Sequence, residues 1–455
     1  MTRYAAHDMP AARLDALDLF LVLLFLFGIY TGLALPIAKG VPFPSAPSGV
    51  AGLLLLFRHA GRARQQHLVA LLFVLVLYLA NILVAPDKTY LLERIKGLIQ
   101  LAYSLIIGYG MFLTLAHADR RQLGRILLFI CLALIAGCML ERTVEPFKAL
   151  SDAVREKIYD AFMVYQADDR DLDLYGGVRP KLFTSEPSAV TFAFTLFSFG
   201  WLAIAPWRDW RVKLVVYVAM LGAGYVAMSG PTLMLGLALV VPYLMIIEPW
   251  RGPGPERKVL PSRVFGVALL GVVLAVAAVV GVTHLYAARL EEVSSSSDPS
   301  FFYRITGPPL VAWDVLLRYP WTGAGLTGEE FISERVLQVY FNSPSFSPDW
   351  KYDTAASVLT NYFWHHWIYL GPLWGIALLG ALSLWLRTLG VVNLTACWIA
   401  WIILGMASGA YVSPKTWFVL LLTAAASVLH HRQPVGVATG QRRTSMRLRP
   451  AMERP

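Results

Sequence analysis

The chain has 455 residues, of which 57% are hydrophobic and only 15% charged, and its formal net charge is +10. Soluble proteins are about a quarter charged, so this composition excludes a soluble multi-domain protein and is typical of one membrane-embedded domain. The mean hydropathy of +0.57 points the same way. Because Cys131, Cys138 and Cys397 all fall inside apolar runs, we expect neither a disulfide framework nor a metal site from them.

Apolar runs long enough to cross a membrane recur along the chain. A transmembrane helix needs about 20 such residues, and lipid offers backbone groups no hydrogen-bond partner, so the runs should be helical. The predicted fold class is all-α, a polytopic membrane helix bundle of about 12 transmembrane helices with two long periplasmic segments that contain short helices. The candidate spans are 16–38, 43–57, 67–85, 95–116, 123–140, 188–207, 211–229, 231–250, 264–285, 360–386, 391–409 and 415–430.

These spans divide the chain into six predicted parts. They are 1–140 with transmembrane helices 1–5, 141–187 as a first periplasmic segment with an amphipathic helix, 188–285 with helices 6–9, 286–359 as a large periplasmic loop, 360–430 with helices 10–12, and 431–455 as a basic cytoplasmic tail that we expect to be disordered.

The distribution of basic residues predicts the orientation. With the N-terminus in the cytoplasm, the cytoplasmic segments carry 22 Lys and Arg residues. The short outer loops carry only Lys39, Lys88 and Lys415, with Arg94 and Lys96 where a helix begins. Cytoplasmic loops are normally enriched in Lys and Arg, so both termini are predicted to be cytoplasmic. The basic tail then needs no nucleic-acid partner.

The first outer segment begins with "VEPFKALSDAVREKIYDAF". Its apolar residues recur at helical spacing, which predicts a helix that either lies on the membrane surface or covers the bundle. The stripe comprises Val144, Phe147, Leu150, Val154, Ile158 and Phe162. The acidic "ADDRDLD" that follows is expected to be a solvated turn.

The same segment ends in "RPKLFTSEPS", 179–188, directly before a span. Glu186 or Ser185 could act as a helix cap, since an acid at a helix N-terminus is favourable. A cap does not explain Arg179. An arginine at this place either reaches lipid phosphate or binds a substrate diphosphate through its planar fork.

The second outer segment contains "FFYRITGPPLVAWDVLLRYPWTGAGL". Arg304 precedes a short helix that should start at Pro308-Pro309 and stop at Tyr319-Pro320. The "TGAG" turn that follows would let the backbone approach a ligand closely.

Two adjacent histidines, His365 and His366, stand in "NYFWHHWIYLGPLWG" where a late span begins. Each is either a packed ring with a polar tip or, beside the outer arginines, an acid, base or phosphate ligand. Arg94 and Lys96 either add positive field around a lipid diphosphate or reach lipid headgroups.

The order of these motifs resembles the O-antigen ligase and polymerase superfamily of bacterial inner-membrane glycosyltransferases. The resemblance covers about residues 175–385 and rests on the Arg-Pro-to-Glu-Pro-Ser stretch, "RITGPPLVAWDVLLRYPWTGAGL" and "HHWIYLGPLWG". Family members often carry Ser-Arg near the seventh span, where this chain has Ser229 followed by Gly230.

The resemblance implies a donor glycan carried on a polyprenyl diphosphate and a site at the periplasmic face. The expected diphosphate-binding residues are Arg179, Arg304, Lys181 and Arg94, and the expected catalytic residues are His365, His366 and Glu186. We expect neither metal nor cofactor, because no acidic metal pair stands out at the outer face. The expected partners are the polyprenyl-diphosphate-linked oligosaccharide donor, a glycan or lipid A-core acceptor, and membrane lipid, with no nucleic acid.

Three functions remain open from the sequence. The "SEPS" form favours an O-antigen or exopolysaccharide polymerase, and the alternative enzyme is an O-antigen ligase that transfers the glycan to lipid A core. The alternative of another class is a polysaccharide or lipid-linked oligosaccharide transporter. Carriers place polar residues near the midplane and show repeated halves, whereas here polar residues gather at one face and no repeat is visible. A structural scaffold would not need the clustered outer cations.

The orientation can be tested by labelling. A cysteine introduced at 170 or at 345 should react with a membrane-impermeant thiol reagent in intact cells, because both positions lie in predicted outer segments. Labelling that occurs only after lysis would reverse the orientation.

Overall fold

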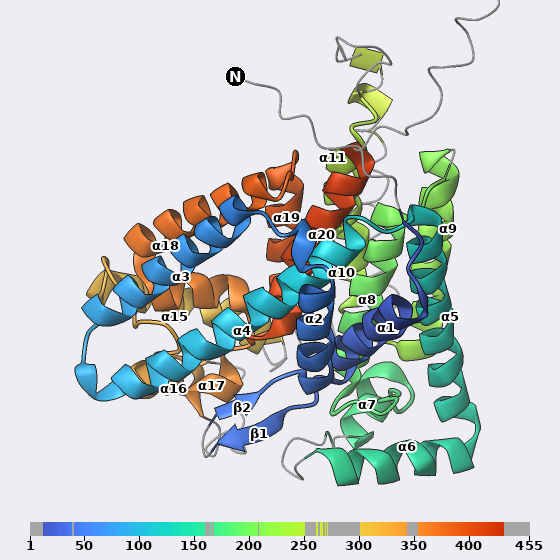
Figure 1. The fold of residues 1–455 in the computed structure, drawn as a ribbon. Helices are drawn as coiled ribbons and strands as arrows, with labels where there is room; N and C mark the ends of the chain where they lie inside the picture. Colours follow the sequence, from blue (N-terminus) through green and yellow to red (C-terminus); the bar gives the residue numbers. More distant parts are fainter. Residues whose placement is uncertain are drawn as a thin grey trace, which may run out of the picture.

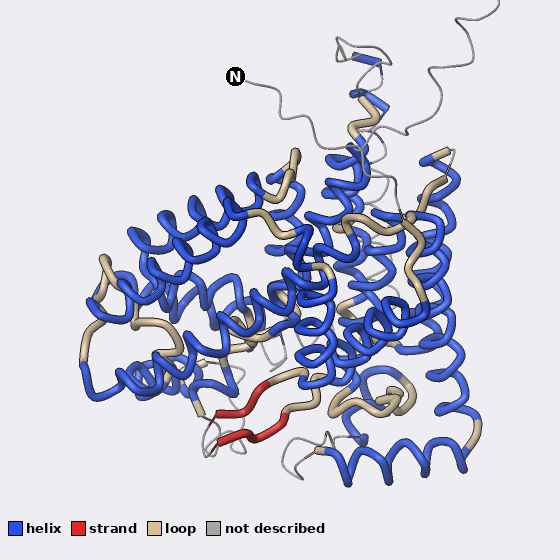
Figure 2. Tube along the Cα trace, viewed as in Figure 1, coloured by secondary structure: helices blue, strands red, loops and turns tan. Residues whose placement is uncertain are grey.

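The structure is a computed structural model that describes residues 12–38, 41–159, 165, 168–207, 209–250, a few positions between 261 and 271, 301–343 and 354–431. Helices dominate these residues (Figures 1 and 2). The all-α prediction needs one correction, because an antiparallel pair of short strands, β1 (Leu35–Ala38) and β2 (Val41–Phe43), follows the first helix. The span predicted at 16–38 therefore ends early, where Gly32 takes a left-handed conformation with φ of 65°.

Eleven of the predicted spans contain a described helix or helix pair, and the span predicted at 264–285 lies largely outside the described residues. The corresponding helices are α1 (Ala16–Thr31), α2 (Ala46–Arg58), α3 (Gln65–Val84), α4 (Leu91–Leu115), α5 (Arg120–Thr143), α8 (Pro187–Ile204), α9 (Trp210–Met228), α10 (Leu233–Ala238) with α11 (Val240–Ile247), α18 (Tyr362–Thr388), α19 (Leu394–Gly405) and α20 (Pro414–His431).

Six helices of the described residues are long and apolar enough to cross a membrane. They are α3, α4 with the short turn before it, α5, α8, α9 and α18. The helices α1, α2 and α19 and the α10–α11 pair are apolar but shorter. By length and composition the chain is therefore a helical protein suited to a membrane.

The remaining helices are short and belong to the connecting segments. They are η1 (Ala60–Arg62), η2 (Lys88–Tyr90), α6 (Glu145–Ile158), α7 (Asp168–Tyr175), the π-helical η4 (Phe302–Thr306), α15 (Gly307–Arg318), η5 (Glu330–Ile332), α16 (Ser333–Phe341) and α17 (Ala355–Val358).

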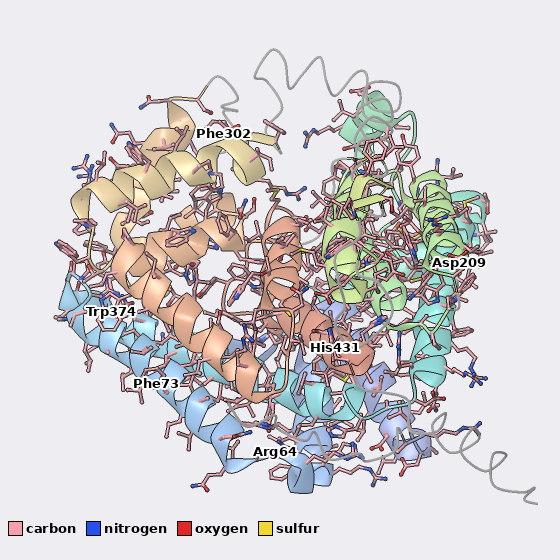
Figure 3. All side chains as sticks on the ribbon, turned by 90° about the horizontal axis from the view of Figure 1, so that it is seen from above. Arg64, Phe73, Asp209, Phe302, Trp374 and His431 are labelled. Carbon is pink, nitrogen blue, oxygen red and sulfur yellow. The ribbon has the colours of Figure 1, made fainter. Side chains whose placement is uncertain are left out.

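Helix α8 lies in the interior of the bundle. In its most apolar stretch 89% of the residues are buried, against 33% for α5 and 39% for α3. Helices α5 and α3 instead expose large apolar side chains such as Phe129 and Leu72, which lipid would cover favourably. Figure 3 shows α3 and α18 on one side of the molecule, marked by Phe73 and Trp374, and α9 on the other, marked by Asp209. The end of α20, marked by His431, lies between these two sides.

Some contacts join connecting segments that are predicted to lie on the same side of the membrane. One set joins segments predicted inside, with the Leu14 amide donating to Gln122 at 2.8 Å and Arg120 lying 3.0 Å from His430. The other joins segments predicted outside, with the Tyr159 hydroxyl donating to the Thr31 carbonyl at 2.9 Å.

Helix α18 is broken inside the span predicted at 360–386. Gly371 has φ of 64° and ψ of 176°, and Pro372 follows it. The break removes helical partners from the carbonyls that precede it. The amides of Ala324 and Gly325 replace those partners, donating at 2.8 Å to the carbonyls of Ile368 and Tyr369.

The "TGAG" turn is therefore a packing element against α18, and its approach to a ligand stays a prediction. Gly323 has φ of 62°, and a Cβ there would lie 2.6 Å from the Gly371 nitrogen and the Ile368 oxygen. Only glycine lets the two backbones come this close.

Arg94 binds this turn, which contradicts its predicted role at a diphosphate. Its guanidinium donates to the Ala324 carbonyl at 2.7 Å and to the Asp87 carbonyl at 2.8 Å, and the side chain is fully buried. A residue enclosed in this way is a structural clamp between α4 and the turn, and it does not face lipid or a substrate.

Helix α6 confirms the predicted helix. In its apolar stripe Val144, Leu150 and Ile158 are exposed, whereas Phe147 packs on Phe183 with ring centroids 5.8 Å apart. The stripe is therefore divided between the surface and contacts with the rest of the protein. Figure 1 shows α6 running across the end of α5, and Phe162 lies outside the described residues.

Alanine substitutions at two glycines test the contact between the "TGAG" turn and α18. Replacing Gly323 by Ala forces a left-handed alanine, which costs about 1–2 kcal/mol, and adds the backbone clash. We expect a clear fall in the unfolding temperature of the purified protein. Gly380→Ala is the matched control, since a Cβ there meets nothing within 4 Å. Equal behaviour of the two variants would contradict the close contact.

Candidate functional site

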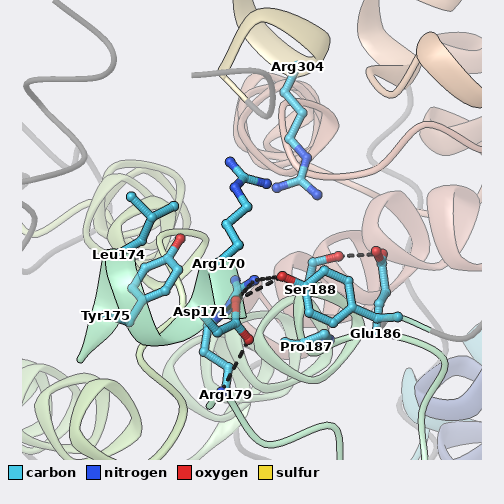
Figure 4. A pocket seen from close by; sticks show the side chains of 10 residues that line it. Arg170, Asp171, Leu174, Tyr175, Arg179, Glu186, Pro187, Ser188 and Arg304 are labelled. Atoms are coloured by element: carbon cyan, nitrogen blue, oxygen red, sulfur yellow. Dashed lines mark hydrogen bonds and ion pairs between the residues drawn. The ribbon is translucent and has the colours of Figure 1, made fainter. Parts of the chain in front are cut away.

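One pocket brings the two outer segments together (Figure 4). Arg170, Asp171, Arg179 and Glu186 come from the first segment and Arg304 from the second. The pocket holds about 390 Å³ of atom-free space with its open mouth included, and Tyr165, Leu174, Tyr175, Pro187 and Ser188 complete its lining. Three arginines against two carboxylates leave the lining with one excess positive charge.

Arg170 is a pocket residue that the sequence analysis missed. The stretch "ADDRDLD" was predicted to be a solvated turn, but residues Asp168–Tyr175 form helix α7. In Figure 4 the Arg170 side chain points toward Arg304. The acidic residues around Arg170 in the sequence do not predict that Arg170 lines a pocket. Its position depends on the burial of Asp171, which the fold decides.

Arg179 lines the pocket, but its charge is already engaged. Its guanidinium contacts Asp171, with Nη2 at 2.7 Å and Nε at 2.8 Å from Oδ1. The same group lies 4.5 Å from the centroid of the Tyr175 ring. Burial lowers the pKa of Arg179, but the Asp171 hydrogen bond and nearby charge outweigh it, so the pKa is raised. Arg179 therefore ties the end of the first segment to α7.

Lys181 does not line the pocket, which contradicts its predicted place beside a diphosphate. Its ammonium donates to Asp168 at 2.7 Å, and only 6% of the side chain is exposed. The ion pair holds the start of α7 against the residues that follow Arg179, so Lys181 is a structural residue.

The backbone between Lys181 and Glu186 adopts an unusual conformation. Leu182 has φ of 36° and Phe183 φ of 63°, a left-handed region that side chains with a Cβ rarely adopt. Such strain persists only where surrounding contacts over-determine the conformation.

Side chains from α5 and α6 supply those contacts. Both carboxylate oxygens of Glu141 accept amides, from Lys181 at 3.0 Å and Leu182 at 2.6 Å. The guanidinium of Arg155 donates to the Thr184 carbonyl at 2.7 Å and the Ser185 carbonyl at 3.2 Å. Neither Glu141 nor Arg155 is predicted as a site residue from the sequence, because their partners lie 40 and 29 residues away and no local pattern indicates them.

Glu186 occupies the N-cap position of α8, but its carboxylate caps no helix amide. It accepts a hydrogen bond from the Ser188 hydroxyl and is exposed on the pocket. The cap interpretation therefore holds for its backbone, while its carboxylate is available to the pocket.

Arg304 lies in the π-helical turn η4, directly before the predicted short helix, which the structure confirms as α15. The Asn361 amide donates to the Arg304 carbonyl at 2.8 Å, so the start of α18 fixes this turn. Short π-helical segments are frequent at functional sites.

Lys415, predicted from the sequence only as an outer-loop charge, lies in the first turn of α20. Its ammonium is 4.1 Å from the centroid of the Phe192 ring of α8. It is not among the residues that line the pocket.

His365 and His366 do not line the pocket, contrary to the prediction that they act beside the arginines. Both rings are buried. His366 lies 2.9 Å from the Tyr411 hydroxyl and 3.1 Å from the Gly375 carbonyl, while His365 stacks on Tyr369 with ring centroids 5.0 Å apart. Within the described ranges no cluster of His, Cys, Asp or Glu could hold a metal ion.

Comparison with known proteins does not assign the chain. No protein-family model matches it, and no curated protein matches it. The functional argument therefore rests on the site.

Glu141 offers a test of how the site is held. Glu141→Ala leaves two buried amides without acceptors, at about 1–3 kcal/mol each. We expect a lower free energy of unfolding and faster proteolysis between 165 and 187. Glu145→Ala on the same face of the membrane is the control, since Glu145 is exposed. A Glu141→Ala protein with the proteolysis rate of the control would show that the carboxylate is not the anchor.

Proposed function

We propose that this chain is a membrane glycosyltransferase that acts on a glycan linked to a polyprenyl diphosphate. We favour an O-antigen or exopolysaccharide polymerase, with the O-antigen ligase reaction on lipid A core as the alternative. The observation that carries the proposal is the pocket in which Arg170 and Arg179 of one outer segment meet Arg304 of the other, beside Glu186.

The chemistry of such a transfer suits these residues. The acceptor oxygen attacks the anomeric carbon of the donor sugar, and the bond from that carbon to the diphosphate oxygen breaks with its electron pair leaving on the diphosphate. The main requirement is stabilisation of that departing charge. A well-aimed donor in a site that excludes water contributes roughly 2.7–4 kcal/mol, by analogy with oxyanion-hole donors.

The residues divide between binding and support. Arg304 and Arg170 are the proposed contacts of the leaving diphosphate, because their side chains point toward one another across the pocket. Arg179 holds Asp171 and positions α7. Glu186 is the proposed base that takes the acceptor proton, since it is the exposed carboxylate of the lining. His365 and His366 are not assigned this role, because they lie away from the pocket.

The pocket is suited to a lipid-linked donor at a membrane surface. Helix α6 exposes Leu150 and Ile158 of its apolar stripe, and α15 exposes Leu310, Trp313 and Leu317. These faces would sit in the interfacial layer, where a polyprenyl diphosphate presents its charged group. We place the pocket at the periplasmic face of a bacterial inner membrane, with both termini in the cytoplasm, on the strength of the basic-residue distribution.

A transporter is the weaker proposal. Transport would need polar residues lining a path near the membrane midplane. Among the described helices, the buried cations Arg94 and Lys213 instead satisfy backbone carbonyls near helix ends, with Lys213 donating to the Ala205 carbonyl at 2.6 Å. These contacts support a site at one surface.

Arg304 provides the main test. Arg304→Ala should lower kcat/KM for glycan transfer by about 100-fold or more, because a donor to the departing charge is lost. Arg304→Lys should recover little, since a point charge cannot reproduce the planar fork. The assay uses purified protein in detergent with a polyprenyl-diphosphate glycan, with and without lipid A core.

Arg318→Ala is the matched control, because Arg318 lies on the neighbouring α15, is exposed and pairs with Asp314 at 3.2 Å. Near-normal transfer by Arg304→Ala would remove the proposed role of the arginine. A product that forms only with lipid A core would assign the ligase reaction in place of the polymerase reaction.

A further inference from the structure

We propose that α15 and the "TGAG" turn are inserted into the membrane leaflet on the side of the predicted outer segments, so that lipid acyl chains cover the exposed apolar face of α15. The segment predicted at 286–359 as a periplasmic loop then contains a re-entrant part. This placement does not require glycan transfer, because it concerns only the medium around the helix.

Helix α15 is apolar on two opposite faces. One face is buried against the protein and comprises Val311, Ala312 and Val315. With 3.6 residues per helical turn, the other side of the helix comprises Leu310, Trp313 and Leu317. These three side chains are 50%, 66% and 66% exposed. A helix that is apolar all round is typical of a protein interior or of a membrane.

The charges of α15 are compatible with lipid. The charged residues within Gly307–Arg318 are Asp314 and Arg318, which pair with each other at 3.2 Å. Long side chains such as Arg318 can extend their charged ends to the headgroup layer. Helix α16 of the same segment instead exposes Glu334 and Gln338, as a helix in water does. The two helices of one segment therefore face different media.

Two hydrogen bonds hold α15 alongside the first part of α18, on which it packs (Figure 1). Before α15, the Asn361 side-chain amide donates to the Arg304 carbonyl at 2.8 Å. After α15, the Ala324 amide donates to the Ile368 carbonyl at 2.8 Å. Asn361 and Ile368 are about 10 Å apart along a helix axis. Because α18 is a candidate membrane span, the end of α15 lies beside residues within that span.

Two further candidate spans supply partners to the carbonyls of the turn. The Asn81 amide of α3 donates to the Thr322 carbonyl at 3.1 Å, and Arg94 of α4 donates to the Ala324 carbonyl at 2.7 Å. Both side chains are fully buried. Irregular backbone is tolerated at membrane depth only where the protein or a water-filled cavity satisfies it. The carbonyls of Thr322 and Ala324 meet this condition through buried side chains.

The exposed face of α15 continues onto α18. A Cβ at Gly371 would lie 3.3 Å from the Pro320 oxygen, so the chain on either side of this contact forms one surface. Trp321 follows Pro320 and is 69% exposed, and Leu373 follows the break and is 54% exposed. Lipid favourably covers exposed apolar side chains of a membrane span, and tryptophan is enriched near the membrane surface. The same lipid layer then covers Trp321 and the exposed face of α15.

The experiment measures which medium surrounds α15. A nitroxide is attached to a single introduced cysteine in the full chain, which is reconstituted into phospholipid vesicles. Its collision rates with oxygen, which concentrates in lipid, and with a water-soluble nickel chelate are compared. Trp313→Cys reports on the exposed face of α15. Gln338→Cys on α16 is the control in water, and Leu72→Cys on α3, where Leu72 is 61% exposed, is the control in lipid. The three native cysteines are buried, and the labelled wild type gives their background.

We expect the ratio of oxygen to nickel collisions at position 313 to be at least about 3-fold higher than at 338 and close to that at 72, because a polar chelate is excluded from hydrocarbon. Equal ratios at 313 and 338 would place the face in water and overturn the proposal. Low collision rates with both reagents at 313 would mean that protein, such as a second copy of the chain, covers the face, which also overturns it. Leu317→Cys carries the same prediction if Trp313→Cys is not recovered folded.

Discussion

The structure depends on one constraint, which is that every backbone polar group beside lipid must find its partner within the protein. Regular helices meet this requirement by themselves, but the chain departs from regular helical geometry at two positions, among others. One is the break in α18 at Gly371, and the other is the left-handed turn at Leu182 and Phe183. At both positions, groups distant in sequence supply the missing hydrogen-bond partners. These two sets of hydrogen bonds, called repairs below, hold the predicted outer segments in place.

The two repairs use different means. At the break in α18 the partners are backbone amides of the "TGAG" turn, which requires Gly323 and Gly371 to approach closely. At the left-handed turn the partners are side chains, Glu141 for the amides and Arg155 for the carbonyls. The first repair brings η4 and α15 to the bundle, and the second fixes the entry to α8. Arg304 and Glu186 both line one pocket.

The cations of the outer face differ in what they contact. Arg94 and Arg155 bind carbonyls, and Arg179 and Lys181 bind Asp171 and Asp168. These contacts compensate the cost of burying charge, and they make the residues structural. Arg179 also lines the pocket, together with Arg170 and Arg304. The number of arginines in the predicted outer segments therefore does not give the number of residues that bind a ligand.

The sequence by itself determined the helical class, the position of most apolar helices and the amphipathic helix α6, since these follow from composition and from the periodicity of neighbouring residues. It also pointed to Arg179, Arg304 and Glu186, because charge beside an apolar span is costly enough to stand out. Only the tertiary structure decided that Arg179 is paired with Asp171, that Arg170 lines one pocket with Arg304, and that His365 and His366 are enclosed. Those outcomes depend on contacts between residues far apart in the chain, such as Arg94 with Ala324 and Glu141 with Leu182, and no local pattern encodes a partner that folding alone brings near.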